Sequence, residues 1–423
     1  MIADSDGSRR RYAMLVVAIL CQLATVAITW KLWQVRDHPV NLPVYSGLPE
    51  ISFGWAMMVS LVIAAVLPKY GVPLHWITLI TASAFDQFRL EPQFFGLAML
   101  MLVYFGDGGL RISRWYLVAM WIWTGIHKFL SPEWMGYLSW GIVDRAGLPA
   151  DNLYLPFAIG VAATELTLGL LACFRPRIAA KLCVAVHLGI VVFLSPLFTE
   201  MNYSVIPWNI AIAVVGYWIL MQYGLEKPEP NRQLPRWEKA VIGLLMVVPI
   251  GFYFGWVDRS FCHVMYSGNL PSGLVTTRQG PIEFDSYDQL AVPFPHERRL
   301  FRLYFARTAQ SGDKLHIADP RTLLDDQYFA LRSDGPQPIT AEEFFGATQI
   351  GGDAKRDQVL GAGIDDQRSL FALSQAGVRM LRRTDQSVVY AAAFTPETFD
   401  RQLVPYLKGL PNLQQIQFAA FLC

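Results

Sequence analysis

The sequence predicts an α-helical polytopic membrane bundle of about nine transmembrane helices, followed by a soluble α/β domain. Hydrophobic residues make up 53% of the 423 residues and charged residues only 16%, against roughly 25% charged in an average soluble chain. Charged residues are scarce before residue 256. The 13 Trp and 17 Tyr are typical of chains whose aromatic side chains lie at the membrane interfaces. We therefore expect a cytoplasmic N-terminus (1–11), a helical bundle (12–256) and an extracytoplasmic domain (257–423).

The N-terminus begins with three arginines at positions 9–11, followed by an apolar run to Trp30. A signal peptide is the alternative interpretation of this pattern. The run is long for a signal peptide, and no small-residue cleavage site follows at residues 29–31. We interpret it as the first membrane helix.

A helix needs about 20 apolar residues to cross the hydrocarbon core. Two of the predicted spans are short and are interrupted by Asp86, Arg89 and Pro92, so they form either a tight hairpin or broken helices. The predicted spans are 12–30, 51–68, 74–86, 92–105, 114–130, 155–173, 178–196, 204–222 and 239–256.

Sidedness follows from the distribution of lysine and arginine between alternate loops, because cytoplasmic loops carry more of both. The richer set includes residues 9–11 and the loops near residues 69, 111–114, 175–181 and 227–239. This distribution predicts a protein of the plasma or inner membrane with its N-terminus in the cytoplasm. Nine spans then place the tail outside, whereas eight would leave it in the cytoplasm.

The tail has the composition of an ordinary soluble domain. Its densest charge cluster, residues 293–302 (PFPHERRLFR), suits either a solvated or headgroup-facing helix or a docking surface. Periodicity predicts helices at 296–307 and 396–407 and strands at 314–317, 387–393 and 415–422.

Charge and cysteine content exclude several functions. The net charge of +1 gives no indication of nucleic-acid binding. The five cysteines form no C-x-x-C pair, so neither a zinc site nor a thioredoxin-like site is expected. Cys262 and Cys423 both lie in the tail and could form a disulfide in an oxidising compartment.

Four ionisable residues lie inside predicted spans, where such groups are costly and are functional candidates: His127, Lys128, Glu165 and His187. Glu165 and His187 fall near the middle of their spans, and adjacent antiparallel helices could bring them together. A desolvated lysine can act as a base, so Lys128, Glu165 and His187 are the candidate catalytic residues. The alternatives are that Lys128 snorkels to water or forms a structural ion pair, and that the other two make interhelical hydrogen bonds.

A second group of polar residues is expected near the outer ends of the helices. Asp86 and Arg89 are one helical turn apart and could instead pair with each other. With the residues above, this group would line a polar cavity that opens outward. The candidate cofactor-binding residues are His127, Asn202, Trp208, Asp86 and Arg89.

The order of these motifs resembles the HTTM family, which includes vitamin K-dependent γ-glutamyl carboxylase. The similarity covers roughly residues 12–225 and is weak at single positions. By this resemblance, Lys128 corresponds to the base that deprotonates reduced vitamin K, and the cofactor would be a quinone. The motifs are Phe85-Asp86 with Phe95-Gly96-Leu97, residues 123–129 (WTGIHKF) with Pro132-Glu133-Trp134 and Gly136-Tyr137, residues 165–171 (ELTLGLL), His187, and Asn202-Tyr203.

The chain departs from the carboxylase at two places. Where the carboxylase has a catalytic histidine, residues 105–109 read FGDGG, and the Asn-Asn-His stretch of the family is replaced by residues 90–94 (LEPQF). Glutamate carboxylation is therefore not expected, and the resemblance leaves open a related quinone-linked or lipid-linked reaction. The helical core also resembles the smaller DoxX/MauE membrane proteins.

Two hypotheses of different kinds follow. The first is a membrane enzyme with Lys128 as general base and a quinone-like or other lipophilic cofactor. The second is a non-enzymatic membrane protein, such as an assembly factor, an immunity-like protein or a receptor, whose outer domain binds a protein partner. A shared pocket for Lys128, Glu165 and His187 would favour the enzyme. A transporter is the third choice, because no paired broken helices occur in matching halves.

Overall fold

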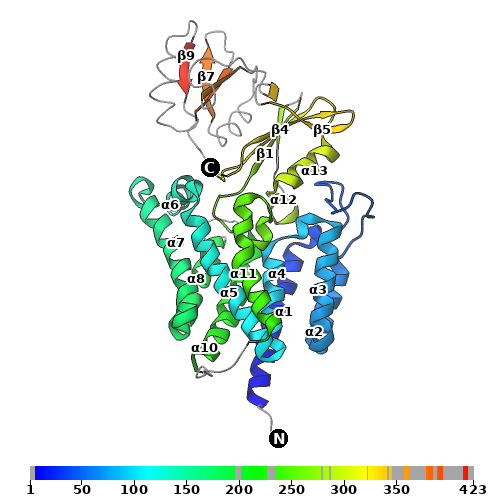
Figure 1. Ribbon diagram of the computed structural model, residues 1–423, viewed down its shortest axis with the longest axis vertical. Helices are drawn as coiled ribbons and strands as arrows, with labels where there is room; N and C mark the ends of the chain where they lie inside the picture. Colours follow the sequence, from blue (N-terminus) through cyan, green and yellow to red (C-terminus); the bar gives the residue numbers. More distant parts are fainter. Residues whose placement is uncertain are drawn as a thin grey trace. The chain divides into compact units, whose positions relative to one another are not determined.

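The computed structural model divides the chain into two compact units, which we describe separately (Figure 1). Unit 1 contains residues 1–270, 285–297 and 320–324, and unit 2 contains 271–284, 298–319 and 325–423. The structure describes residues 5–195, 202–225, 234–277, 280–284, 287–321, 323–340, 343–344, 357–361, 378–383, 388–393 and 413–417.

Five helical segments in the described chain are long and apolar enough to cross a membrane. Two shorter apolar helices, Gly54–Val66 and Pro92–Tyr104, accompany them. Membrane helices are therefore supported by length and composition, while the count of nine and the sidedness stay predictions. The five are Gly7–Ile28, Ala150–Phe174, Pro176–Leu194, Tyr203–Gly224 and Arg236–Phe254.

The first part of unit 1 places α1 against α4 and pairs α2 with α3 (Figure 1). Helix α3 begins at Pro68, six residues before the predicted span 74–86, because proline suits the first position of a helix. Helix α2 has 13 residues, or about 20 Å, against a hydrocarbon core of about 30 Å. The elements are α1 Ser5–Ile28, η1 Trp30–Trp33, α2 Gly54–Val66, α3 Pro68–Phe85, η2 Gln87–Arg89, α4 Pro92–Met101 and η3 Leu102–Tyr104.

The central part of unit 1 is formed by α5, α7 and α8, of which α5 and α7 are packed most extensively. Helix α7 begins at Ala150, five residues before the predicted span 155–173, and continues through Pro156. The elements are α5 Gly106–Phe129, the π-turn η4 Trp134–Leu138, α6 Ser139–Arg145, α7 Ala150–Phe174 and α8 Pro176–Leu194.

The last helices of unit 1 are interrupted. A π-turn separates α9 from α10, and a 3₁₀ segment follows α11. Helix α11 packs against α5 (Figure 1). The elements are η5 Tyr203–Val205, α9 Ile206–Ala211, η6 Ile212–Gly216, α10 Tyr217–Leu225, α11 Arg236–Val247, η7 Val248–Phe254, η8 Arg259–Phe261 and α12 Tyr287–Leu290.

Unit 2 contains antiparallel sheets, ordered β2-β1-β3-β4-β5 and β6-β8-β7-β9. The first sheet packs with α13 around the buried side chains of Phe301, Phe305, Leu315 and Ile317. The elements are β1 Ser272–Thr277, β2 Gly280–Glu283, α13 Arg298–Thr308, β3 Lys314–Ala318, β4 Gln327–Arg332, β5 Gly335–Pro338, β6 Asp357–Gly361, β7 Val378–Arg383, β8 Val388–Ala393 and β9 Leu413–Gln417.

Several local predictions for the tail are confirmed. Helix α13 covers most of the predicted helix 296–307, and β3 and β8 match the strands predicted at 314–317 and 387–393. The last predicted strand overlaps β9, although residues 418–423 lie outside the described chain. The helix predicted at 396–407 and the partner thiol Cys423 also lie outside it, so both stay predictions. So do the boundaries of the predicted domains.

Candidate functional site

Lys128 and Glu165 form a buried ion pair between α5 and α7. Lys128 Nζ donates to both carboxylate oxygens of Glu165, at 3.0 and 2.8 Å, and to the carbonyl oxygen of Met265 at 3.2 Å. The Trp134 ring centroid lies 5.2 Å from Nζ. The two side chains are 4% and 13% exposed. All three ammonium N–H groups therefore have acceptors, and Lys128 does not snorkel.

Two glycines explain how α5 and α7 come close enough for this pair. A Cβ atom at Gly125 would lie 2.8 Å from both the Ala162 carbonyl oxygen and the Leu166 nitrogen. On α7, Gly169 in turn approaches the backbone of α5, with Ile122 N only 3.0 Å from its Cβ position. Small residues allow membrane helices to pack backbone to backbone. Gly125 is one turn before Lys128 and Gly169 one turn after Glu165, so the close contact determines the pair.

Residues 259–269 cover this pair, and we call them the plug segment; they begin with the short 3₁₀ helix η8 and continue without helix or strand. The segment contacts the bundle through the Met265 carbonyl on Lys128 and through Phe261, whose ring lies 6.0 Å from that of Phe95. His263 and Tyr266 have positive φ angles of 58° and 50°. Such conformations cost about 1–3 kcal/mol each and concentrate at functional sites.

His127 is bound by the protein at both ring nitrogens. Nε2 lies 2.8 Å from the Cys262 carbonyl oxygen, which can only accept, so Nε2 carries the proton. Nδ1 then accepts from the Tyr253 hydroxyl at 2.7 Å. His127, predicted to bind a cofactor, here holds the plug segment against α5.

His187 lies in a different part of the bundle from Lys128. Trp121 Nε1 donates to His187 Nε2 at 2.9 Å, so the ring proton is on Nδ1, which donates to Asn209 Oδ1 at 2.8 Å. Asn209 in turn donates to the Val205 carbonyl at 2.9 Å. The ring joins α5, α8 and α9. Its two hydrogen bonds go to neither Lys128 nor Glu165, and its predicted catalytic role is not tested.

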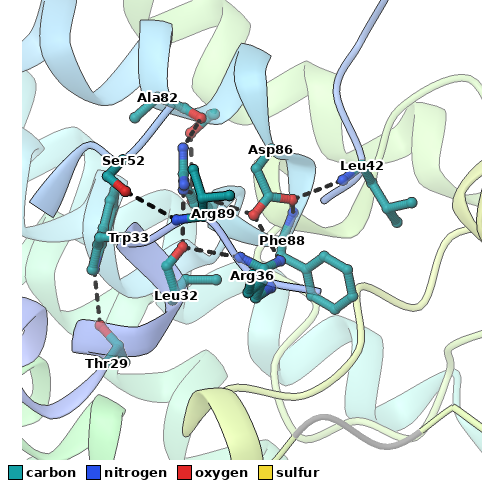
Figure 2. Close-up of polar contacts among 12 residues, drawn as sticks. Thr29, Leu32, Trp33, Arg36, Leu42, Ser52, Ala82, Asp86, Phe88 and Arg89 are labelled. Carbon is teal, nitrogen blue, oxygen red and sulfur yellow. Dashed lines mark hydrogen bonds and ion pairs between the residues drawn. The ribbon is translucent and has the colours of Figure 1, made fainter. Parts of the chain in front are cut away.

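Asp86 and Arg89 belong to a third buried cluster, which Figure 2 shows with Arg36. Asp86 Oδ2 lies 2.7 Å from Arg36 Nη2 and 3.8 Å from Arg89 Nε, so its closer partner is Arg36. Its other oxygen accepts from the backbone N–H groups of Leu42 and Phe88. The expected pairing of Asp86 with Arg89 is present but is the weaker of the two.

The arginines of this cluster also bind backbone carbonyls (Figure 2). Arg89 donates to Leu32 and Ala82, both at 3.0 Å, and Arg36 donates to Leu32 at 3.2 Å. These carbonyls lie at the ends of η1 and α3, where helices leave acceptors unsatisfied. The cluster therefore fastens the segment after α1 to the end of α3.

Asn202 and Trp208 lie at the start of the α9 region. Asn202 Oδ1 accepts from the Ser204 hydroxyl at 2.6 Å, and Ser204 Oγ accepts from Gln93 Nε2 at 3.1 Å. Trp208 is 3% exposed and packs against Gly96 of α4. The eight predicted residues thus fall into separate clusters, and ion pairs join Lys128 to Glu165 at 2.8 Å and Asp86 to Arg89 at 3.8 Å.

A buried network missed by sequence reasoning joins the plug segment to the loop before α4. Arg259 Nη2 lies 2.6 Å from Glu91 Oε1, and the Arg259 backbone N–H donates to Glu297 Oε1 at 2.5 Å. Burial raises the pKa of Glu91 to about 7. Burial, aided by the nearby Asp258, raises the pKa of Glu297 to about 8. No spacing rule links residues so distant in sequence.

Met265, which binds Lys128, and Glu133, which lies against Gly268 of the plug segment, were also missed. Met265 acts through its backbone, which leaves no signal in the sequence. Glu133 keeps exposed surface, yet enough protein surrounds its carboxyl group to raise its pKa to about 7. Its position five residues after Lys128, in the motif Pro132-Glu133-Trp134, was the available signal.

Within the described residues, no group of three or more His, Cys, Asp or Glu side chains could hold a metal ion. No protein-family model, curated protein or solved structure matches this chain.

Proposed function

We propose that this chain is an integral membrane protein of the HTTM type, in which Lys128 and Glu165 form an acid–base pair acting on a lipophilic, quinone-like molecule. The observation that supports it most is the burial of a lysine and a carboxylate in direct contact beneath the plug segment, whose backbone is strained at His263 and Tyr266. Intramembrane ionisable groups are retained mainly where they function, and strained backbone has the same association.

The pair can supply a base without releasing a proton to water. In the proposed reaction Lys128 passes a proton to Glu165 along their hydrogen bond, which leaves a neutral amine and a neutral acid. The amine then removes a proton from an acidic O–H group of the substrate, and Glu165 keeps the first proton. The missing histidine at residues 105–109 leads us to omit glutamate carboxylation from this proposal.

A non-enzymatic membrane protein with a partner-binding soluble unit is the second candidate. It is favoured by one observation, namely that every N–H group of Lys128 already has an acceptor. A purely structural ion pair would look the same. An experiment on proton transfer is therefore needed to separate the two.

The test uses reduced 2-methyl-1,4-naphthoquinone, added without oxygen to the full-length protein in lipid nanodiscs. We expect the long-wavelength absorbance of its monoanion in the wild type and its loss in Lys128→Met. Lys181→Met is the matched control, because Lys181 is an exposed lysine on α8, and it should behave as wild type. An anion band of equal size in Lys128→Met, or no band in any variant, would reject the base role.

A further inference from the structure

The candidate span formed by α11 and η7 has an exposed tryptophan at each end. The 12 residues of α11 and the 7 residues of η7 extend for about 32 Å at the rise of each helix type, close to the hydrocarbon core of about 30 Å. Trp237 near the start of the span and Trp256 just after its end are 56% and 78% exposed. Because tryptophan is enriched at both membrane interfaces, Trp256 marks the interface at the η7 end.

A loop from the tail returns to this end of the span. Residues 320–324 belong to unit 1, although in the sequence they lie between β3 and β4. Arg321 is 3% exposed, its Nη1 donates to the Phe252 carbonyl oxygen at 2.7 Å, and its guanidinium carbon lies 4.4 Å from the Phe252 ring centroid. A methyl carbon of Leu324 lies 3.4 Å from the Cβ position of Gly255. The loop is therefore fastened to the end of η7 at two points.

The loop exposes an apolar side chain between these two contacts. Leu323 is 62% exposed. On the adjoining segment, Phe254 is 43% exposed and stacks on Trp256, with the ring centroids 4.8 Å apart. Single exposed apolar residues are ordinary, whereas a group of them on adjoining segments marks a contact with a protein or a membrane. We call Leu323, Phe254 and Trp256 the loop patch.

The loop patch continues an exposed apolar stripe along α11 and η7. Leu244, Val247 and Ile250 are 60%, 60% and 46% exposed, and Phe254 follows four residues later. Residues three or four positions apart lie on one face of a helix. Because α11 and η7 form a candidate span, lipid is the neighbour expected along this stripe. Continuity of the apolar surface then favours lipid at the loop patch as well.

We propose that the loop patch is a membrane-binding surface, and that Arg321 holds residues 320–324 so that Leu323 enters the lipid interface. The partner is the lipid surface itself. The tail then binds the bilayer through a segment of its own, in addition to the membrane helices. This proposal does not depend on the acid–base role of Lys128.

A nitroxide spin label on Leu323→Cys tests the proposal in the full-length protein, in nanodiscs of palmitoyl-oleoyl phosphatidylcholine. Oxygen concentrates in lipid and a nickel chelate stays in water, so the ratio of their collision rates with the label reports its surroundings. We expect a ratio at Leu323→Cys several times that at Ser333→Cys, which lies in the exposed turn after β4. Leu244→Cys on α11 is the lipid reference. Wild-type protein treated with the label gives the background from native cysteines.

A second variant tests the part played by Arg321. Arg321→Met, made in the Leu323→Cys protein, removes the donor to the Phe252 carbonyl and should lower the ratio to the Ser333→Cys value. Arg332→Met is the matched control, because the Arg332 side chain is 58% exposed, and it should leave the ratio unchanged. Thermal unfolding in the same nanodiscs shows whether each variant is folded, and the comparison of Leu323→Cys with Ser333→Cys needs no change at Arg321.

Three results would count against the proposal. Equal ratios at Leu323→Cys and Ser333→Cys would overturn it, because the loop would then lie in water. Dipolar broadening between labels that disappears on dilution with unlabelled protein would also overturn it, since a second copy of this chain would then cover the loop patch. An unchanged ratio in Arg321→Met would overturn the assignment of Arg321 as the residue that holds the loop.

Discussion

The Asp86 cluster and the Lys128–Glu165 pair are both buried charges in unit 1, but they are built differently. Asp86 is shared by Arg36 and Arg89, whose remaining donors mostly bind backbone carbonyls at helix ends. Lys128 has one carboxylate partner and one carbonyl, and the pair sits where two helices pack closest.

The difference is one of chemistry as well as geometry. A guanidinium group stays protonated in proteins, so the Asp86 cluster can only keep its charges and hold chain segments together. The ammonium of Lys128 donates hydrogen bonds to the carboxylate of Glu165, and a proton can pass between two such groups. The first arrangement is suited to structure, and the second is the better candidate for function.

The largest effect is expected from Asp86→Ala. Removing this carboxylate leaves two buried guanidinium groups without their shared anion and should lower the free energy of unfolding by about 3–5 kcal/mol. Glu165→Ala should cost less, about 1–3 kcal/mol, because it leaves one cation and not two without an anion, and Lys128 keeps the Met265 carbonyl oxygen as an acceptor. Unfolding by SDS in mixed micelles measures both variants. Equal losses would contradict the distinction between the two clusters.

A smaller effect is expected from Gly125→Ala. The new methyl group would press on the backbone of α7, which should destabilise the protein by about 1–3 kcal/mol and loosen the Lys128–Glu165 contact. Gly160→Ala on α7 is the matched control, because nothing lies within 4 Å of its Cβ position. Since alanine favours helix over glycine, the control should be neutral or slightly stabilising. A stable Gly125→Ala protein would show that close packing does not position the pair.

These clusters also show how far sequence reasoning reached. Apolar length located the helices that are long and apolar enough to cross a membrane, and periodicity located β3 and β8, because both signals are local. The grouping of Lys128, Glu165 and His187 was only partly anticipated. Depth along a helix can be counted from the sequence, whereas the direction in which a side chain points depends on which face packs. Glycine contacts turn Lys128 toward α7, while His187 meets Trp121 two turns earlier on α5.

The Asp86 cluster was harder to predict for another reason. The spacing of Asp86 and Arg89 suggested their pairing, but the nearer partner, Arg36, comes from the loop after α1. Its position depends on how that loop folds back over α3. The same holds for Met265 at Lys128, since a backbone carbonyl from a distant segment has no signature in the sequence.

The smallest effect is a pH dependence of the free energy of unfolding, and it comes from the carboxyl group of Glu297. At Asp86 the nearest partners include arginine side chains, whereas Glu297 accepts a hydrogen bond from a backbone N–H group. Glu297 receives a backbone N–H bond from Arg259 and lies near Asp258, and its pKa is raised from 4.5 to about 8, chiefly by burial. The folded protein therefore keeps a proton that the unfolded chain loses near pH 4.5. Its contribution to stability is complete below that pH and is lost as the pH rises toward 8.

Stability should consequently fall between about pH 5 and pH 8, with a slope from this group of at most about 1.4 kcal/mol per pH unit. Glu297→Gln keeps an acceptor for the Arg259 N–H but cannot ionise, so its profile should be flatter in that range. SDS unfolding measured at several pH values gives both curves. If wild type and Glu297→Gln had the same slope, Glu297 would be ionised in the folded protein. The plug segment would then be held by charge pairs like those of Asp86, because an ionised Glu297 needs Arg259 or Arg321 as its counter-ion.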